Sequence, residues 1–217
     1  MEPMSEVQKK KVIVGISGGG RSLKNLYERT QTGVYPFEIM GVISSNPTCA
    51  GNELARKFRL PLFIGDFSAK HRSETSIKMA EWIEESSADL IALAGFLKPF
   101  PLDHKLGDQI INIHPSLLPK FGGPGMYGKR VHEAVVAAGE EFSGATIHAV
   151  TEKYDEGPII AQVSVKVPSS DPQELADEVF KAECELYPEV LRLISEGKLN
   201  LRPREIYHLV QDHGGDA

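Results

Sequence analysis

The chain has 217 residues, with 24 basic and 30 acidic side chains and a formal net charge of −6. This length suits one domain with a sizeable core, and 41% apolar with 25% charged residues is an ordinary globular composition. The negative charge argues against general binding to nucleic acid or to an anionic membrane. No apolar stretch approaches the ~18 residues of a membrane span, and the polar start MEPMSEVQKK lacks the apolar core of a signal peptide. We therefore expect a cytoplasmic protein with no nucleic-acid or membrane partner.

The first half of the chain alternates short β-rich runs with longer amphipathic segments. Strands are expected over residues 12–17, 37–45, 61–65, 89–95 and 109–114, and helices near residues 22–32, 50–58 and 70–86. The expected strands are almost continuously apolar, which is typical of a parallel sheet covered by helices on both faces.

The second half of the chain changes character. Residues 146–150 and 159–167 are predicted as strands separated by a polar turn, which favours antiparallel pairing. A long helix is expected over residues 172–196, with Asp171 as its N-cap, a proline at its first position and Gly197 as its stop.

These elements predict the α/β fold class. We expect a single domain over residues 11–201, with a Rossmann-like, mostly parallel sheet, helices on both faces and an antiparallel C-terminal part. Residues 1–10 are expected to be disordered or frayed, and residues 202–217 to form a C-terminal tail.

The segment GISGGGRS, residues 15–22, connects the first expected strand to the first expected helix. Glycines at such a turn let backbone N–H groups approach an anion, and the helix N-terminus adds a positive dipole. Two cofactor patterns fail here, because Arg21 replaces the lysine of a phosphate loop and Leu23 replaces the last glycine of a dinucleotide fingerprint. A phosphate monoester held by Arg21 and Ser22, and a glycine turn without a ligand, both remain open.

Asn112 and His114 lie near the carboxyl end of the fifth expected strand. Residues two apart in a strand face the same side, so the two side chains project together at the edge where open α/β sheets bind their ligands. An amide beside an imidazole suits the stabilisation of an oxyanion and the transfer of a proton. A buried pair that only satisfies its own hydrogen bonds is the alternative.

Other polar positions are less informative by themselves. Asp155, in the segment YDEGP, is by local sequence a turn aspartate. His148 shares a strand face with Thr146, and would either orient an acid or fill the core. Cys49 and Cys184 lie far apart, so reduced structural thiols are expected, and no metal-ligand spacing is present.

Four segments together resemble the folate-dependent formyltransferases. They are INIHPSLLPKF (111–121), SGATIHAV (143–150), YDEGPII (154–160) and LIALAGFLKPF (90–100). The resemblance covers about residues 11–200, and its N-x-H-P-S-L-L-P motif is highly specific. Within this family, the motifs fit best those members that formylate the amine of 5′-phosphoribosylglycinamide in purine biosynthesis.

The resemblance implies roles for residues at the matching positions. The catalytic residues would be Asn112, His114 and Asp155, with His148 and Thr146 as supporting residues. The phosphate and ribose of the substrate would be held by Gly19, Gly20, Arg21, Ser22 and Glu183. The folate would be held by Phe96, Leu97, Lys98, Pro99, Phe100, Tyr154 and Asp155.

The implied reaction moves the formyl group of the cosubstrate 10-formyltetrahydrofolate onto the acceptor amine, without a metal ion. The partners would thus be small-molecule substrates, and a monomer or a homodimer is expected. Asn112 would donate a hydrogen bond to the oxyanion, and Asp155 would raise the pKa of His114 above its usual value of about 6.5.

The stretch FGGPGMYGKRVHEAV (121–135) departs from the family, because it is longer than the usual segment after L-L-P-K. This segment borders the expected site, so a formyltransferase with another acceptor, such as a sugar-nucleotide amine, and a formylfolate hydrolase that uses water remain alternatives. A non-catalytic nucleotide-binding module is a third hypothesis. The presence of Asn112, His114 and Asp155 argues against it, since binding alone does not need all three residues.

Overall fold

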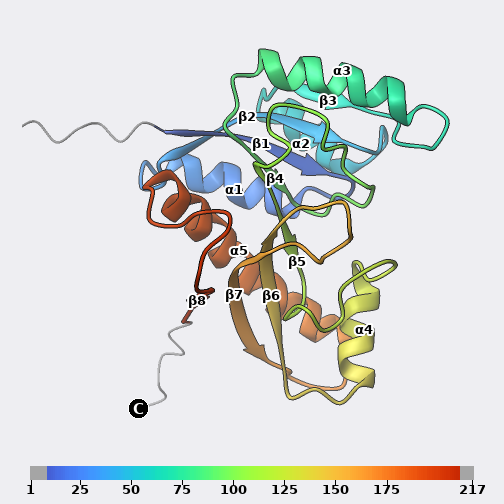
Figure 1. Cartoon of the computed structure of the whole chain (residues 1–217). Helices are drawn as coiled ribbons and strands as arrows, with labels where there is room; N and C mark the ends of the chain where they lie inside the picture. Colours follow the sequence, from blue (N-terminus) through green and yellow to red (C-terminus); the bar gives the residue numbers. More distant parts are fainter. Residues whose placement is uncertain (1–8, 211–217) are drawn as a thin grey trace, which may run out of the picture.

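The computed structural model describes residues 9–210, which form one mixed sheet flanked by helices (Figure 1). The strands are β1 (Lys10–Ile16), β2 (Phe37–Ser44), β3 (Leu62–Ile64), β4 (Leu90–Leu93), β5 (Ile110–His114), β6 (Phe142–Ala149), β7 (Ile159–Lys166) and β8 (Tyr207–Leu209). The helices are α1 (Arg21–Gln31), α2 (Ala50–Lys57), α3 (Arg72–Glu85), α4 (Lys129–Ala137) and α5 (Pro172–Ser195). Every strand and helix expected from the sequence is confirmed.

The strands lie in the order β3-β2-β1-β4-β5-β6-β7-β8. From β3 to β5 each strand runs parallel to its neighbours, whereas β6 runs antiparallel to both β5 and β7. The expected α/β fold, a mostly parallel sheet with an antiparallel C-terminal part, is therefore confirmed. The direction changes at β5, so the strand that carries Asn112 and His114 borders both halves of the sheet.

The core lies on both faces of the sheet. Along β1, Val12 and Val14 pack on the face that is covered by α1 and α5. Ile13, between them, packs on the opposite face with Met79 and Ile83 of α3. The alternation of side chains along a buried strand explains why the apolar run has no polar face: each side is covered by helices.

Two elements of the structure were not expected from the sequence. In the second half of the 121–135 segment, the residues from Lys129 onward form α4. Residues 207–209, which lie in the expected C-terminal tail, form β8, and β8 pairs in parallel with residues 161–163 of β7. A three-residue edge strand carries too little pattern to be seen in a sequence, and its stability comes from the neighbouring strand.

The predictions for the chain ends are tested only in part. Residues 1–8 and 211–217, which fall within the segments expected to be frayed or tail-like, lie outside the described residues. Lys10, the last residue of the first of these segments, begins β1.

Helix α5 is fixed at its start and near its middle. The side chain of Asp171 accepts a hydrogen bond from the N–H of Gln173, and Pro172 occupies the first turn, as predicted. The buried hydroxyl of Tyr187 donates a hydrogen bond of 3.0 Å to the carbonyl of Leu93, at the end of β4. Tyr187 therefore ties α5 to the carboxyl edge of the parallel half of the sheet.

Replacing Tyr187 with phenylalanine should lower the free energy of unfolding by about 1–3 kcal/mol, because the carbonyl of Leu93 then stays buried without its donor. Chemical denaturation of the variant measures this loss. Tyr27 provides the control, since its ring stacks on Phe58 and is only half-buried; Tyr27→Phe should change the free energy of unfolding by no more than about 0.5 kcal/mol. A Tyr187→Phe protein as stable as the parent would show that the hydrogen bond does not hold α5.

Candidate active site

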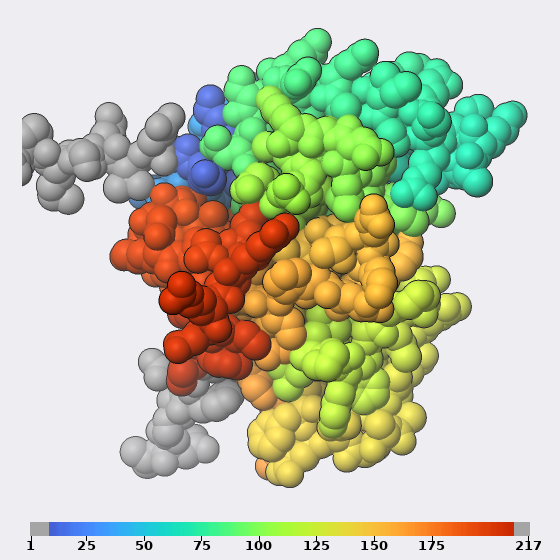
Figure 2. Space-filling model, viewed as in Figure 1, coloured from blue at the N-terminus to red at the C-terminus, as the bar shows by residue number. Residues whose placement is uncertain are grey.

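A cleft of about 1040 Å³ runs along the carboxyl ends of β1, β4 and β5. Its walls come from one face of α5 and from residues 18–22, 93–103, 112–115, 123–129 and 150–155, together with Arg72, Ser76, His132 and His148. Figure 2 shows the connection between β6 and β7, in orange, between the segment that follows β4 and the segments that follow β5. Open α/β sheets bind their ligands at this edge, where the ends of parallel strands meet.

The pairing of β5 with β6 brings four polar side chains into two adjacent rows. Asn112 lies opposite His148, and His114 lies opposite Thr146. The amide Nδ2 of Asn112 is 3.1 Å from Nε2 of His148. The Nδ1 of His148 is 3.0 Å from a carbonyl oxygen, that of Ala149, so Nδ1 donates and Nε2 accepts one amide hydrogen from Asn112. The second amide hydrogen of Asn112 is left for the cleft.

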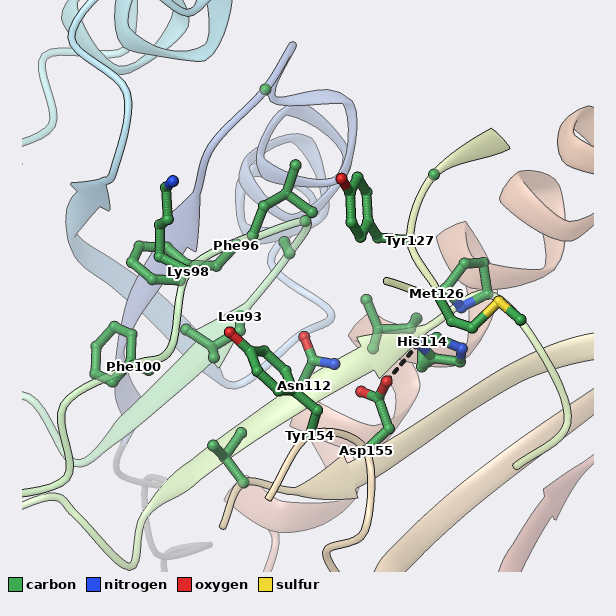
Figure 3. Close-up of a pocket in the computed structure, with 18 of the residues that line it drawn as sticks. Leu93, Phe96, Lys98, Phe100, Asn112, His114, Met126, Tyr127, Tyr154 and Asp155 are labelled. Carbon is green, nitrogen blue, oxygen red and sulfur yellow. Dashed lines mark ion pairs between the residues drawn. The ribbon is translucent and has the colours of Figure 1, made fainter. Parts of the chain in front are cut away.

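The carboxylate of Asp155 lies between the two histidines. Its Oδ2 is 3.5 Å from Nδ1 of His114, and its Oδ1 is 3.5 Å from Nε2 of His148. The backbone N–H of Gly123 donates a hydrogen bond of 2.9 Å to Oδ2. In Figure 3 the side chains of His114 and Asp155 point toward each other, beside Asn112. The structure thus brings the three expected catalytic residues together.

The backbone around Asp155 has the form that this placement needs. Asp155 has φ 56°, in the left-handed region that aspartate adopts more readily than most residues. Two residues later the chain passes so close to β6 that a Cβ on Gly157 would lie 1.7 Å from the carbonyl oxygen of Ala149. Glycine is therefore required at residue 157, and the D-x-G-P pattern describes a turn that presses the carboxylate into the cleft.

His114 is 4% exposed, and burial sets its protonation. Burial lowers the pKa of His114, and this effect outweighs the charge of Asp155, which raises it. The predicted upward shift of the His114 pKa is therefore wrong, because the cost of removing an imidazolium from water exceeds the attraction at 3.5 Å. The Nε2 of His114 donates to the carbonyl of Phe121 at 2.8 Å, so in the neutral ring Nδ1 is the basic nitrogen.

Asp155 has the opposite tendency. Burial acts to raise the pKa of its carboxyl, but the neighbouring His148 and His114 and the backbone N–H of Gly123 together lower it. The resting pair therefore consists of an ionised carboxylate beside a neutral imidazole. Such a pair accepts a proton on the imidazole and stabilises the resulting cation.

Thr146 has a structural contact rather than a place in the cleft. It is buried, its hydroxyl donates to the carbonyl of Ser116 at 2.6 Å, and the hydroxyl oxygen accepts from the N–H of Leu118 at 3.0 Å and from the amide of Gln162 at 3.0 Å. These contacts hold the P-S-L-L-P turn that follows His114.

The glycine loop lies at the other end of the cleft, at the start of α1. Gly20 is the N-cap and has φ 74°, and a Cβ there would lie 2.9 Å from the Cα of Gly51 in α2. Gly18, Gly19, Gly20, Arg21 and Ser22 all line the cleft. The loop therefore presents the start of a helix, with its free backbone N–H groups, to the same cavity as the catalytic residues.

Glu183 reaches the cleft from α5. Burial raises the pKa of its carboxyl to about 7, although the positive charge of Arg21 acts to lower it. A carboxyl group with this pKa accepts hydrogen bonds when ionised and donates one when protonated, and both forms suit a sugar hydroxyl.

The wall opposite α5 is apolar and carries the expected folate segment. Phe96 packs edge-on against Phe100, with ring centroids 5.1 Å apart, and Phe96 also contacts Phe67 in this way. Figure 3 shows Leu93, Phe96, Lys98 and Phe100 on one side of the cavity, with Tyr154 beside Asn112. Leu97 and Pro99 also line the cavity. Every residue expected to hold folate thus borders the cleft.

The sequence analysis missed several residues that line the cleft. They are Arg72 and Ser76 of α3, Met126 and Tyr127 before α4, His132 of α4, and Gln173, Ala176, Val179 and Phe180 of α5. His132 is 6% exposed, and its Nδ1 is buried without a hydrogen-bond partner among the described residues. The spacing of positions 173, 176, 180 and 183 along one helix face, toward Glu183, was a signal that could have found the α5 residues.

Two classes of site have no counterpart within residues 9–210. No group of three or more His, Cys, Asp and Glu side chains there is arranged to hold a metal ion. No helix in this part of the chain is long and apolar enough to cross a membrane.

Comparisons with known proteins identify the family. A family model described as formyl transferase matches residues 10–191, and the chain therefore belongs to the formyl transferase family. The resemblance inferred from the N-x-H-P-S-L-L-P and D-x-G-P segments is thereby confirmed.

The similar proteins within this family include phosphoribosylglycinamide formyltransferases. The chain is 36% identical to the chloroplastic phosphoribosylglycinamide formyltransferase of Arabidopsis thaliana over 202 residues, 91% of this chain and 69% of that protein. It is 31% identical to the phosphoribosylglycinamide formyltransferase of Haemophilus influenzae, over 91% of this chain and 93% of that protein. The solved structure of the Coxiella burnetii phosphoribosylglycinamide formyltransferase matches with a TM-score of 0.80 and 32% identity, over 90% of this chain and 91% of that chain.

The raised pKa of Glu183 gives a prediction for stability. Because the folded state binds the proton more tightly than the unfolded state, stability falls as pH rises from about 4.5 to above 7. Glu183→Gln removes this titration. The melting temperature of the variant should therefore exceed that of the parent at pH 8, and the difference should be smaller or absent at pH 5. Thermal unfolding at both pH values measures it. An equal change at both pH values would contradict a raised pKa of the Glu183 carboxyl.

Proposed function

We propose that this chain catalyses transfer of the formyl group from 10-formyltetrahydrofolate to the amine of 5′-phosphoribosylglycinamide, the activity that names its relatives. The observation that carries the proposal is the buried contact of His114 and Asp155 beside Asn112, in a cleft bounded by an aromatic wall at one end and a glycine loop at the other. The aromatic wall suits the folate rings, and the loop suits a phosphate.

The proposed roles follow from the polar atoms in the cleft. In the reaction, a bond forms between the acceptor amine and the formyl carbon, and the bond from that carbon to N10 of folate breaks. The free amide hydrogen of Asn112 donates to the oxygen of the formyl group, on which negative charge develops. The donor is fixed before the substrate arrives, because the other amide hydrogen is bound to His148.

The proton moves through His114. The attacking amine loses a proton as it becomes an amide, and the leaving N10 gains one. Neutral His114 takes the proton on Nδ1 and returns it to N10, so protons balance over the cycle. Asp155 stabilises the imidazolium between these two steps, from 3.5 Å away. This role suits a neutral resting histidine, whereas an imidazolium at rest has no site for the amine proton.

The acceptor is supported by features of the opposite end of the cleft. The loop of Gly19, Gly20, Arg21 and Ser22 would bind the 5′-phosphate, and Glu183 would bind the ribose hydroxyls. A hydrolase that passes the formyl group to water needs neither group, so their presence in one cavity with His114 favours a phosphorylated acceptor over water.

The activity is tested by incubating the purified chain with 5′-phosphoribosylglycinamide and 10-formyltetrahydrofolate. We expect tetrahydrofolate to form only when the acceptor is present, in equal amounts with formylated ribonucleotide, as measured by absorbance and mass spectrometry. Release of formate in an acceptor-free control would identify a hydrolase instead. No reaction in either mixture would contradict the proposal and favour a binding module.

The catalytic roles are tested by Asp155→Asn, which keeps the shape of the side chain and removes its charge. This change should lower kcat by about 10²-fold or more with little rise in KM, because the lost interaction matters mainly when His114 is charged. The same variant should shift the acidic limb of the kcat profile to lower pH, since Asp155 raises the pKa of His114.

Alanine variants distinguish a catalytic role of His114 and Asn112 from a structural one. If the role is catalytic, His114→Ala and Asn112→Ala should each lose about 10²-fold or more in kcat while the folded fraction stays high. Their double variant should lose less than the product of the two, because both act on one reaction centre. A well-folded His114→Ala protein with normal kcat would end the catalytic assignment.

The remaining expectations stay predictions. The plant relative is chloroplastic by name, so the cytoplasmic location inferred for this chain rests on its sequence alone. A monomer and a homodimer are both compatible with the proposed reaction, since the cleft described here is lined by one chain.

A further inference from the structure

An aromatic contact links the glycine loop to α5. The guanidinium carbon of Arg21 lies over the ring of Phe180, 3.6 Å from the ring centroid. Arg21 is the first residue of α1, and Phe180 is half-buried in α5. Both residues line the cleft. This is a cation–π contact at the closest end of the usual range.

The contact leaves the hydrogen-bond donors of Arg21 available. A guanidinium group carries its N–H donors around its edge, in the plane of the group, so an aromatic ring that covers one face does not block them. A flexible arginine loses side-chain freedom when it binds an anion, whereas one already held against a ring loses less. Phe180 therefore prepares Arg21 for a phosphate without competing for it.

The carboxylate beside Arg21 competes only weakly with a phosphate for the guanidinium group. Its nearest carboxylate oxygen, on Asp177, is 4.0 Å away, and both side chains are more than half exposed. Exposed pairs at this separation contribute little, so an incoming phosphate replaces this contact at small cost. Glu183 lies three residues after Phe180 on α5, which puts the two side chains on the same face of the helix.

We propose that Phe180 is a positioning residue for the phosphate of the acceptor. It holds the guanidinium of Arg21 at the start of α1, so that Arg21 and the first backbone N–H groups of this helix bind one phosphate monoester together. The inference rests on the proposed function for the identity of the acceptor. Phe180 itself would contact neither the formyl group nor the amine, so its effect falls on the binding of the phosphorylated acceptor and not on the chemical step.

Calorimetry with 5′-phosphoribosylglycinamide and with its dephosphorylated riboside tests the proposal. Phe180→Ala should weaken binding of the phosphorylated acceptor by about 3- to 20-fold, the range of a cation–π contact. Binding of the riboside should change by less than about 2-fold, since it has no phosphate for Arg21 to bind. Phe180→Tyr keeps an aromatic face and should restore binding to within about 2-fold of the parent.

A double variant separates positioning from direct contact. If Phe180 acts through Arg21, then Arg21→Ala with Phe180→Ala should bind the phosphorylated acceptor no more weakly than Arg21→Ala alone. Additive losses, equal losses for the riboside, or a Phe180→Tyr protein as weak as Phe180→Ala would each overturn the proposal.

Arg29 offers a matched control on the same helix. It also pairs with α5, through Glu185, and lies 5.7 Å from the ring centroid of Tyr35, but it does not line the cleft. Arg29→Ala should lower the melting temperature without changing the affinity for the phosphorylated acceptor. A loss of affinity in Arg29→Ala as large as that in Phe180→Ala would show that any loosening between α1 and α5 suffices, and would overturn the specific role of Phe180.

Calorimetry also separates this proposal from the proposed function. A parent chain that binds the phosphorylated acceptor and transfers no formyl group would contradict the proposed reaction. The binding measurements on the Phe180 variants would still decide the role of Phe180. A parent chain that does not bind the phosphorylated acceptor would overturn both.

Discussion

The site depends on one buried charge, the carboxylate of Asp155. It lies between two histidines and accepts the N–H of Gly123, and together these neighbours lower the pKa of the carboxyl although its side chain is only 11% exposed. A buried charge without such partners would take up a proton or destabilise the fold. The left-handed backbone at Asp155 and the close passage of Gly157 beside β6 are the local geometry that brings the carboxylate to these partners.

The partners of Asp155 are in turn fixed by the sheet. The antiparallel register of β5 and β6 places His148 opposite Asn112. In both His114 and His148, one ring nitrogen donates a hydrogen bond to a backbone carbonyl. Each ring therefore has a defined hydrogen position, and its other nitrogen faces the carboxylate. The change from parallel to antiparallel strands at β5 thus has a chemical consequence, since it lets two neighbouring strands contribute to one polar group.

The two ends of the cleft, on either side of the polar side chains of β5, β6 and Asp155, differ in polarity. The aromatic segment after β4 offers an apolar surface, and the glycine loop after β1 offers backbone N–H groups and Arg21. Helix α5 contributes Phe180 and Glu183 to the end of the cleft that holds the glycine loop. The hydroxyl of Tyr187, on the same helix, donates a hydrogen bond to the carbonyl of Leu93 and so ties α5 to β4, the strand that leads into the aromatic segment. Movement of α5 would therefore affect the two ends together.

The sequence by itself determined the order of strands and helices, the α/β class and the place of the polar pair on the fifth strand. These features follow from local apolar patterns and from the two-residue period of a strand, which need no tertiary information. The motif containing Asn112 and His114 also identified the family, and Asp155 entered the site through that resemblance, because its local sequence describes only a turn.

Only the tertiary structure decided the protonation of His114, the strand at residues 207–209 and the contact of Arg21 with Phe180. The pKa of His114 depends on how much water the fold removes from it, and neighbouring residues in sequence do not carry that information. The short strand is stable because β7 supplies its hydrogen bonds. Arg21 and Phe180 are far apart in the chain, and they meet because α1 and α5 cover the same face of the sheet.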